Sequence, residues 1–112
     1  MRRGEVWWAS MGEPRGSEPG YRRPVLVISA NEFNESNIQT VLCAILTTNL
    51  AIADAPGNTR LGHKESGLRR DSVVNVSQLV TLDKRFFSQP VRALPKRTLR
   101  RVEVGLKLVL GL

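Results

Sequence analysis

Two short apolar runs, residues 25–28 and 41–46, limit the folds open to this chain of 112 residues. Each run has the length of a β-strand, and neither approaches the roughly 20 residues that a helix needs to cross a bilayer. Because the runs are continuous rather than alternating, they are typical of strands buried on both faces. We therefore expect a core built around two central strands, and no contact with a membrane.

Further segments with strand character flank the two runs, separated by turn residues. Residues 11–20 contain three Gly and two Pro, which predicts a loop. Residues 31–37 are polar and could hold one helical turn, whereas residues 63–67 are expected to form a second loop. The expected strands span residues 5–10, 24–29, 39–47, 57–61, 72–76 and 91–94.

The pattern changes at Pro95, which suits the first turn of a helix. Beyond it, Leu99, Val102 and Leu106 recur at helical spacing, while arginines occupy the other face. Five to seven short strands followed by one helix predict a single, mainly β domain over residues 1–112. The simplest arrangement is a strongly curved antiparallel sheet or partly open barrel, capped by the helix.

The net charge of the chain indicates the class of molecule that it binds. Seventeen Lys and Arg against ten Asp and Glu give a formal net charge of +7. Such a field attracts polyanions, and arginine, the commoner of the two here, binds phosphate in a bidentate manner. Nucleic acid is therefore the favoured partner, although a cationic surface without a partner fits the charge as well. The lone Cys43 lies in an apolar run, which indicates core packing in a reducing cytoplasm.

No metal ion or cofactor is expected. The chain has one His and one Cys, and its acidic residues are scattered without an Asp-x-Asp pattern. No glycine-rich phosphate loop is present either. His63 lies in a polar segment, where a solitary histidine is more often solvated than catalytic.

Polar groups gather where the two central strands begin and end. Arg23 lies between the 11–20 loop and a buried strand, and Pro24 biases it toward extended geometry. Thr47, Thr48 and Asn49 directly follow the second apolar run. If the strands are neighbours, these groups converge at one rim of the sheet as possible phosphate contacts. The residues alone equally allow Arg23 to form a structural ion pair and the threonines merely to end a strand.

Short motifs in order along almost the whole chain carry a family resemblance. They are Arg3-Gly4-Glu5-Val6-Trp7, Gly16-Ser17-Glu18, Arg22-Arg23-Pro24-Val25-Leu26-Val27-Ile28, Ala44-Ile45-Leu46-Thr47-Thr48-Asn49, Pro56-Gly57-Asn58, Leu68-Arg69-Arg70-Asp71-Ser72-Val73-Val74-Asn75 and Gln78-Leu79-Val80-Thr81-Leu82-Asp83-Lys84. Together with the C-terminal helix they resemble the MazF/PemK/Kid toxins, and look especially like the mycobacterial MazF branch.

The resemblance implies a small SH3-like, partly open β-barrel that forms a homodimer. It also implies the toxin of a type II toxin–antitoxin system, which cleaves single-stranded RNA at specific sequences without a metal ion and so inhibits translation and growth. A MazE-like antitoxin would block the RNA groove with an acidic tail. The family's catalytic positions fall on Arg23, Thr47 and Glu18. Its groove-lining positions fall on Ser17, Thr48, Asn49, Arg69, Arg70, Asp71, Ser72, Asn75 and Gln78.

Metal-free RNA cleavage uses the 2′-hydroxyl as nucleophile and leaves a 2′,3′-cyclic phosphate and a 5′-hydroxyl. Arg23 would stabilise charge on the phosphate, and Thr47 would hold a nonbridging oxygen or orient the 2′-hydroxyl. The base stays open between Glu18 and, less favoured, His63. Trp7 and Trp8 face opposite ways on a strand; one is assigned to the core, and the other could stack a base or sit in a dimer interface.

Two other functions fit the same sequence. A CcdB-like toxin on this fold would poison a protein such as DNA gyrase through its C-terminal helix, and would not need the Arg23 and Thr47 pair. A non-catalytic nucleic-acid-binding module would explain the charge but not the polar cluster at the rim. A small-molecule hydrolase is disfavoured because no nucleophile and base pair is apparent.

Overall fold

The computed structural model describes residues 1–12, 16 and 21–112. The described strands form one antiparallel sheet in the order β4-β5-β3-β2-β1-β6. The strands are β1 (Glu5–Ser10), β2 (Arg22–Val27), β3 (Thr40–Thr47), β4 (Thr59–Leu61), β5 (Ser72–Asp83) and β6 (Phe87–Ala93). The helices are α1 (Asn31–Asn34), α2 (His63–Ser66), α3 (Lys96–Leu110) and the 3-10 helices η1 (Leu50–Asp54) and η2 (Lys84–Phe86).

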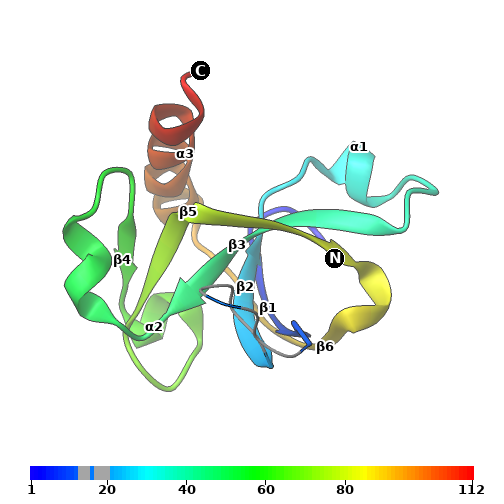
Figure 1. The fold of residues 1–112 in the computed structure, drawn as a ribbon, viewed down its shortest axis with the longest axis horizontal. Helices are drawn as coiled ribbons and strands as arrows, with labels where there is room; N and C mark the ends of the chain where they lie inside the picture. Colours follow the sequence, from blue (N-terminus) through cyan, green and yellow to red (C-terminus); the bar gives the residue numbers. More distant parts are fainter. Residues whose placement is uncertain (13–15, 17–20) are drawn as a thin grey trace.

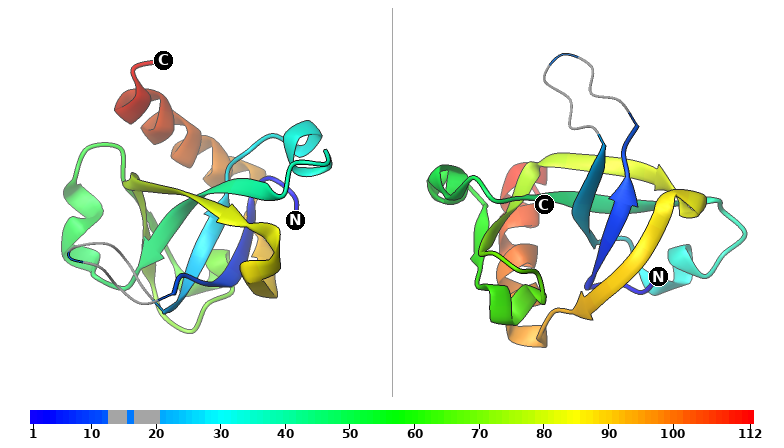
Figure 2. Two further views of the ribbon diagram at one scale, coloured as in Figure 1. Left: turned by 45° about the vertical axis from the view of Figure 1, so that its right-hand side comes forward. Right: turned by 90° about the horizontal axis from the view of Figure 1, so that it is seen from below.

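The sheet curls strongly, and α3 packs against its β4 and β5 side, whereas α1 lies near the start of β3 (Figures 1 and 2). A mainly β fold with a C-terminal helix, as expected, is confirmed. Among the described residues, no helix has both the length and the apolar character required to span a bilayer.

Alternation along the central strands supplies two apolar cores, one on each face of the sheet. Leu26 and Leu46 belong to the cluster that includes Val102 and Leu106 of α3. Val25, Val27, Cys43 and Ile45 belong to the second cluster. The central strands are therefore buried on both faces, as their continuous apolar runs predict. Burial raises the pKa of the Cys43 thiol to about 12, so this cysteine acts as a small apolar core residue.

The two tryptophans do face opposite ways. Trp7 packs with the second cluster, where its ring meets Phe87 edge to face with centroids 5.9 Å apart. Trp8 packs against the first cluster. Both therefore contribute to a core, although each remains partly exposed.

Helix α3 is held by one buried face and by an ionic contact at its start. Thr98, Val102, Gly105 and Leu106 are its buried residues, and they recur at helical spacing. Glu65 of α2 accepts hydrogen bonds from the Thr98 hydroxyl at 2.5 Å and from the Arg101 guanidinium at 3.0 Å. These hydrogen bonds lower the pKa of Glu65, the Thr98 contact most strongly.

Strand β5 is longer than the expected strand at residues 72–76, because it continues through a bulge. Ile45 of β3 pairs with Asn75, but the preceding Ala44 pairs with Leu79, so residues 76–78 have no partner on β3. A bulge bends its strand and increases the local twist. The polar Ser77 and Gln78 interrupt the apolar pattern at this point, which concealed the second half of the strand.

Other expected boundaries also need correction. The last strand begins at Phe87 rather than at residue 91, and its pairing with β1 contains two register shifts. It lies at the sheet edge, where Pro90 is tolerated because a donor is not needed on the open side. Residues 63–66 form the short helix α2, not a loop, and η1 lies in the connection after β3.

Candidate functional site

A groove of about 890 Å³ lies where β2 begins and β3 ends. It is lined by residues of β1, β2, β3 and β6 and by the connection between α2 and β5. The described lining residues are Trp8, Arg22, Arg23, Pro24, Leu46, Thr47, Thr48, Gly67, Leu68, Arg69, Arg70, Ser72, Gln89, Pro90 and Val91.

The pairing of β2 with β3 brings Arg23 and Thr47 together. Val25 lies opposite Ile45 and Leu26 opposite Ala44, where the paired part of the two strands ends; the same register, continued, would set Arg23 across from Thr47. Opposed residues of an antiparallel pair extend their side chains from the same face. Pro24 has no N–H group to donate, so the hydrogen-bonded pairing of β2 with β3 stops before Arg23. The ends of the two strands beyond that point border the groove.

Both side chains have polar atoms available to a ligand. The Thr47 hydroxyl oxygen accepts a hydrogen bond from the backbone N–H of Asn49 at 3.2 Å, which leaves its own hydrogen to donate. Within the described part of the chain, no hydrogen bond or ion pair involves the Arg23 guanidinium. The groove thus offers a guanidinium and a hydroxyl from two neighbouring strands.

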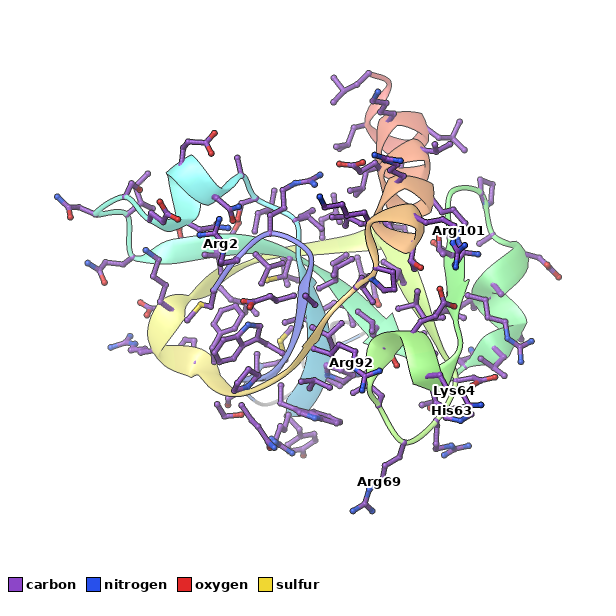
Figure 3. All side chains as sticks on the ribbon, turned by 180° about the vertical axis from the view of Figure 1, so that it is seen from behind. Arg2, His63, Lys64, Arg69, Arg92 and Arg101 are labelled. Atoms are coloured by element: carbon purple, nitrogen blue, oxygen red, sulfur yellow. The ribbon has the colours of Figure 1, made fainter. Side chains whose placement is uncertain are left out.

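The opposite wall of the groove adds positive charge. Arg69 and Arg70 come from the connection that leads into β5, and Ser72 is the first residue of that strand. Figure 3 shows Arg69 extending from the connection into solvent. With Arg22 and Arg23, four arginines line the groove, and none of its described lining residues is acidic. An anion in the groove would therefore meet cations from two walls.

Asp71 lies between two groove residues in sequence, but its carboxylate is held outside the groove. It accepts a hydrogen bond from the backbone N–H of His63 at 2.9 Å, lies 3.0 Å from the His63 Nδ1, and pairs with the Arg60 guanidinium at 3.2 Å. These contacts, first of all that with the His63 ring, lower the pKa of Asp71 to about 2. Asp71 is not among the described residues that line this groove, and its charge is directed to the start of α2.

Replacing Asp71 by asparagine is expected to lower the free energy of unfolding at neutral pH. The folded-state pKa of about 2 lies below the ordinary value of 3.8. The carboxylate therefore stabilises the fold above about pH 4 and ceases to do so as the pH falls through 2. The gap between wild type and Asp71→Asn in urea-unfolding midpoints should be widest near neutral pH and narrow between pH 5 and 2. Asp54→Asn is the control, because Asp54 is exposed and its side chain makes no hydrogen bond or ion pair with another described residue. A gap independent of pH would contradict the prediction.

The groove does not include every residue named from the resemblance. The Asn49 side chain accepts a hydrogen bond from the Ala51 N–H and so caps η1. Asn75 and Gln78 hydrogen-bond to each other at 3.1 Å, across the bulge in β5. None of these three lines the groove. Ser17 and Glu18 lie outside the described residues.

Two residues with polar side chains that sequence reasoning did not assign, Arg22 and Gln89, line the groove. Arg22 projects from the strand face opposite to that of Arg23, and its guanidinium carbon lies 4.5 Å from the centroid of the Trp8 ring. Gln89 was overlooked because the last strand was expected to begin only at residue 91, two residues after Gln89. The adjacent pair Arg22 and Arg23 was the available signal, since consecutive strand residues face opposite ways.

Neither a cluster of metal ligands among the described residues nor the single histidine forms part of the groove. Over residues 1–12, 16 and 21–112, no three His, Cys, Asp or Glu side chains come close enough to hold a metal ion together. His63 is exposed, pairs with Asp71 and does not line the groove.

Comparison with known proteins identifies the class of protein. Residues 2–110 match the family described as "PemK-like, MazF-like toxin of type II toxin-antitoxin system". The chain belongs to this family of toxins.

Named relatives extend the comparison. The chain is 44% identical over 112 residues to Endoribonuclease MazF6 of Mycobacterium tuberculosis, which covers 100% of this chain and 98% of that protein. It is 31% identical to Endoribonuclease EndoA of Bacillus subtilis, over 100% of this chain and 96% of the relative. The fold matches a mycobacterial endoribonuclease solved in complex with its cognate antitoxin, with a TM-score of 0.81 at 22% identity, over 100% and 96% of the two chains.

Proposed function

We propose that this toxin is a metal-independent endoribonuclease that cleaves single-stranded RNA at specific sequences. The observation that carries the proposal is the groove, which Arg23 and Thr47 line from neighbouring strands and in which four arginines meet no acidic residue among the described lining residues. The relatives at 44% and 31% identity are named endoribonucleases. Cleavage of RNA in such a groove would inhibit translation and growth.

The groove supplies donors to a phosphate and therefore suits attack by the adjacent 2′-hydroxyl. In this reaction the 2′-oxygen gives up its proton and bonds to phosphorus, and the bond to the 5′-oxygen breaks. The departing 5′-oxygen takes up a proton from Arg23 or from solvent, so the products are a 2′,3′-cyclic phosphate and a 5′-hydroxyl. Arg23 binds the scissile phosphate and stabilises its added negative charge, and Thr47 donates to a nonbridging oxygen. Arg69, Arg70, Thr48 and Ser72 hold the flanking backbone.

The proton of the 2′-hydroxyl requires a base. Arginine is a poor acceptor because its pKa exceeds about 12. His63 is disfavoured because it pairs with Asp71 away from the groove. Glu18 is the carboxylate we assign to this role, on the family resemblance.

The alternatives account for less of the site. A module that only binds nucleic acid needs the arginines but not an apposed Arg23 and Thr47. A toxin that poisons gyrase through its C-terminal helix needs neither, and the named relatives are nucleases.

We further propose that the toxin acts in the cytoplasm as a homodimer of single-domain chains and is inhibited by a MazE-like antitoxin. Val104, Leu108 and Leu112 are 70%, 62% and 86% exposed at four-residue spacing, which gives the C-terminal end of the chain an apolar stripe suited to a second copy. An acidic antitoxin tail has the charge to occupy the arginine-lined groove, and the solved mycobacterial endoribonuclease is in complex with its antitoxin. Sedimentation of the purified protein tests the dimer.

Incubation of the purified protein with single-stranded RNA in excess chelator tests the nuclease. We expect cut RNA with 2′,3′-cyclic phosphate and 5′-hydroxyl ends, because the groove itself supplies the groups that stabilise the phosphate. The same RNA with a 2′-deoxy nucleotide at the cleavage site should remain intact, since it lacks the nucleophile. Intact RNA in the presence of folded protein would refute the proposal, and cutting of the deoxy substrate would refute the mechanism.

A further inference from the structure

Arg22 and Trp8 form a stacked pair at the β1, β2 and β6 side of the groove. The guanidinium carbon lies 4.5 Å from the centroid of the Trp8 ring. Arg22 Nη2 donates to Gln89 Oε1 at 2.9 Å, and Nε donates to the Ser88 hydroxyl at 3.4 Å. Ser88 in turn donates to the Trp8 carbonyl oxygen at 3.2 Å. The guanidinium is thus fixed at one face and along one edge.

This arrangement differs from that of an arginine placed to bind phosphate. A phosphate takes an edge of the guanidinium, where the N–H groups point, whereas the edge of Arg22 formed by Nε and Nη2 is already engaged by Ser88 and Gln89. One planar face lies on Trp8, and the residue is nevertheless exposed and lines the groove. What Arg22 offers to the groove is its second planar face.

We propose that Arg22, backed by Trp8 and positioned by Gln89, is a stacking platform for one unpaired base of the RNA. Proteins that bind single strands hold splayed bases on aromatic rings or on guanidinium planes. Here the base, the guanidinium and the indole would form three layers, with Arg23 contributing to phosphate binding from the opposite strand face. The platform rests on the proposed function, and it assigns a base contact to a residue next to the catalytic arginine.

The competing explanation is that the pair only ties β2 to β6. That role needs the cation near the ring, the hydrogen bond to Gln89 and no RNA at all. A lysine at this position keeps the charge and can approach the ring, but it loses the plane on which a base can stack. Arg22→Lys therefore removes the plane on which a base could stack, while it keeps the positive charge and the contact with the ring that could tether the strands.

The test pairs this substitution with removal of single bases from the RNA. The cleavage site of the wild type is mapped first, and a short RNA of that sequence is blocked by a 2′-O-methyl group at the scissile nucleotide. Abasic positions are then scanned along it, and the dissociation constant is measured for each RNA with wild type and with Arg22→Lys. We expect one position whose base removal weakens wild-type binding by roughly 5- to 100-fold. The same removal should cost the variant less than about twofold, because the platform is already lost.

Two further variants keep the result interpretable. Trp8→Phe keeps an aromatic ring in the core. It should reduce the loss of affinity that follows removal of the base, and only at the same base position. Arg85→Lys is the matched control, because the Arg85 guanidinium lies 5.1 Å from the Phe86 ring centroid on η2 and outside the groove. It should behave as wild type throughout, and thermal melts should show that all three variants are folded.

The outcomes separate this inference from the function on which it rests. Equal losses in wild type and Arg22→Lys at every abasic position would overturn the platform while the nuclease stands. A uniform loss for Arg22→Lys across all RNAs would make Arg22 a charge contact or a tether, and would also overturn it. A wild type that cuts no RNA would remove the proposed function instead.

Discussion

Alanine in place of Arg23 is expected to reduce the rate of RNA cleavage by about 100- to 1,000-fold, the usual effect of removing one preorganised donor from a charged transition state. Thr47→Ala should cause a loss of similar kind. The reason is positional, since both residues line the groove from the neighbouring strands β2 and β3. The loss should appear in the single-turnover rate with saturating enzyme, because the contact strengthens as charge builds on the phosphate.

The neighbouring residues provide the controls for this pair. Thr48→Ala removes the hydroxyl that directly follows β3, and it should reduce the rate much less. Arg97→Ala removes an exposed arginine of α3 that does not line the groove, and it should leave the rate unchanged. A large loss for Thr48→Ala with a small one for Thr47→Ala would transfer the role by one residue. Equal cutting by all variants would exclude both residues from the chemistry.

Gly105→Ala is expected to destabilise the fold by about 3 kcal/mol or more, although alanine normally favours a helix over glycine by about 1 kcal/mol. A Cβ at Gly105 would lie 1.9 Å from the Gly57 carbonyl oxygen, a backbone atom that cannot rotate away. Gly57 itself has a φ of +83°, so the turn that approaches the helix is constrained as well. The backbones of α3 and this turn can approach only while position 105 has no side chain.

Thermal unfolding measures this effect directly. For a domain of this size, the loss corresponds to a fall in Tm of roughly 15 °C. Lys107→Ala, on the exposed side of the same helix, should shift the free energy of unfolding by no more than about 0.5 kcal/mol. A variant Gly105→Ala with wild-type stability would mean that the helix and the turn separate without cost.

The central strands and the final helix were predictable because each depends on a local pattern. The apolar runs of β2 and β3 were readable without knowing their partners, and the 3.6-residue period of α3 needed only its own sequence. By contrast, the second half of β5 and the start of β6 depend on register shifts against β3 and β1. Such shifts are set by pairing across the sheet, which leaves little trace in the sequence of either strand.

The candidate site likewise contains residues that the sequence predicted and residues that only the fold revealed. The convergence of Arg23 with Thr47 followed from two strands expected to be neighbours, and the family resemblance selected the pair. Asp71 shows what was not predictable, because only the fold reveals that its carboxylate pairs with Arg60 and His63 outside the groove. Gln89 became visible only once β6 was known to lie beside β1.

The position of β1 between β2 and β6 makes the first strand of the chain depend on the last. Both of these strands line the groove, β1 through Trp8 and β6 through Gln89, Pro90 and Val91. A nascent chain that has not reached β6, or a truncated product without it, has neither the full sheet nor the complete groove. We therefore expect the groove to be complete only after residues 87–93 have been synthesised and have paired with β1.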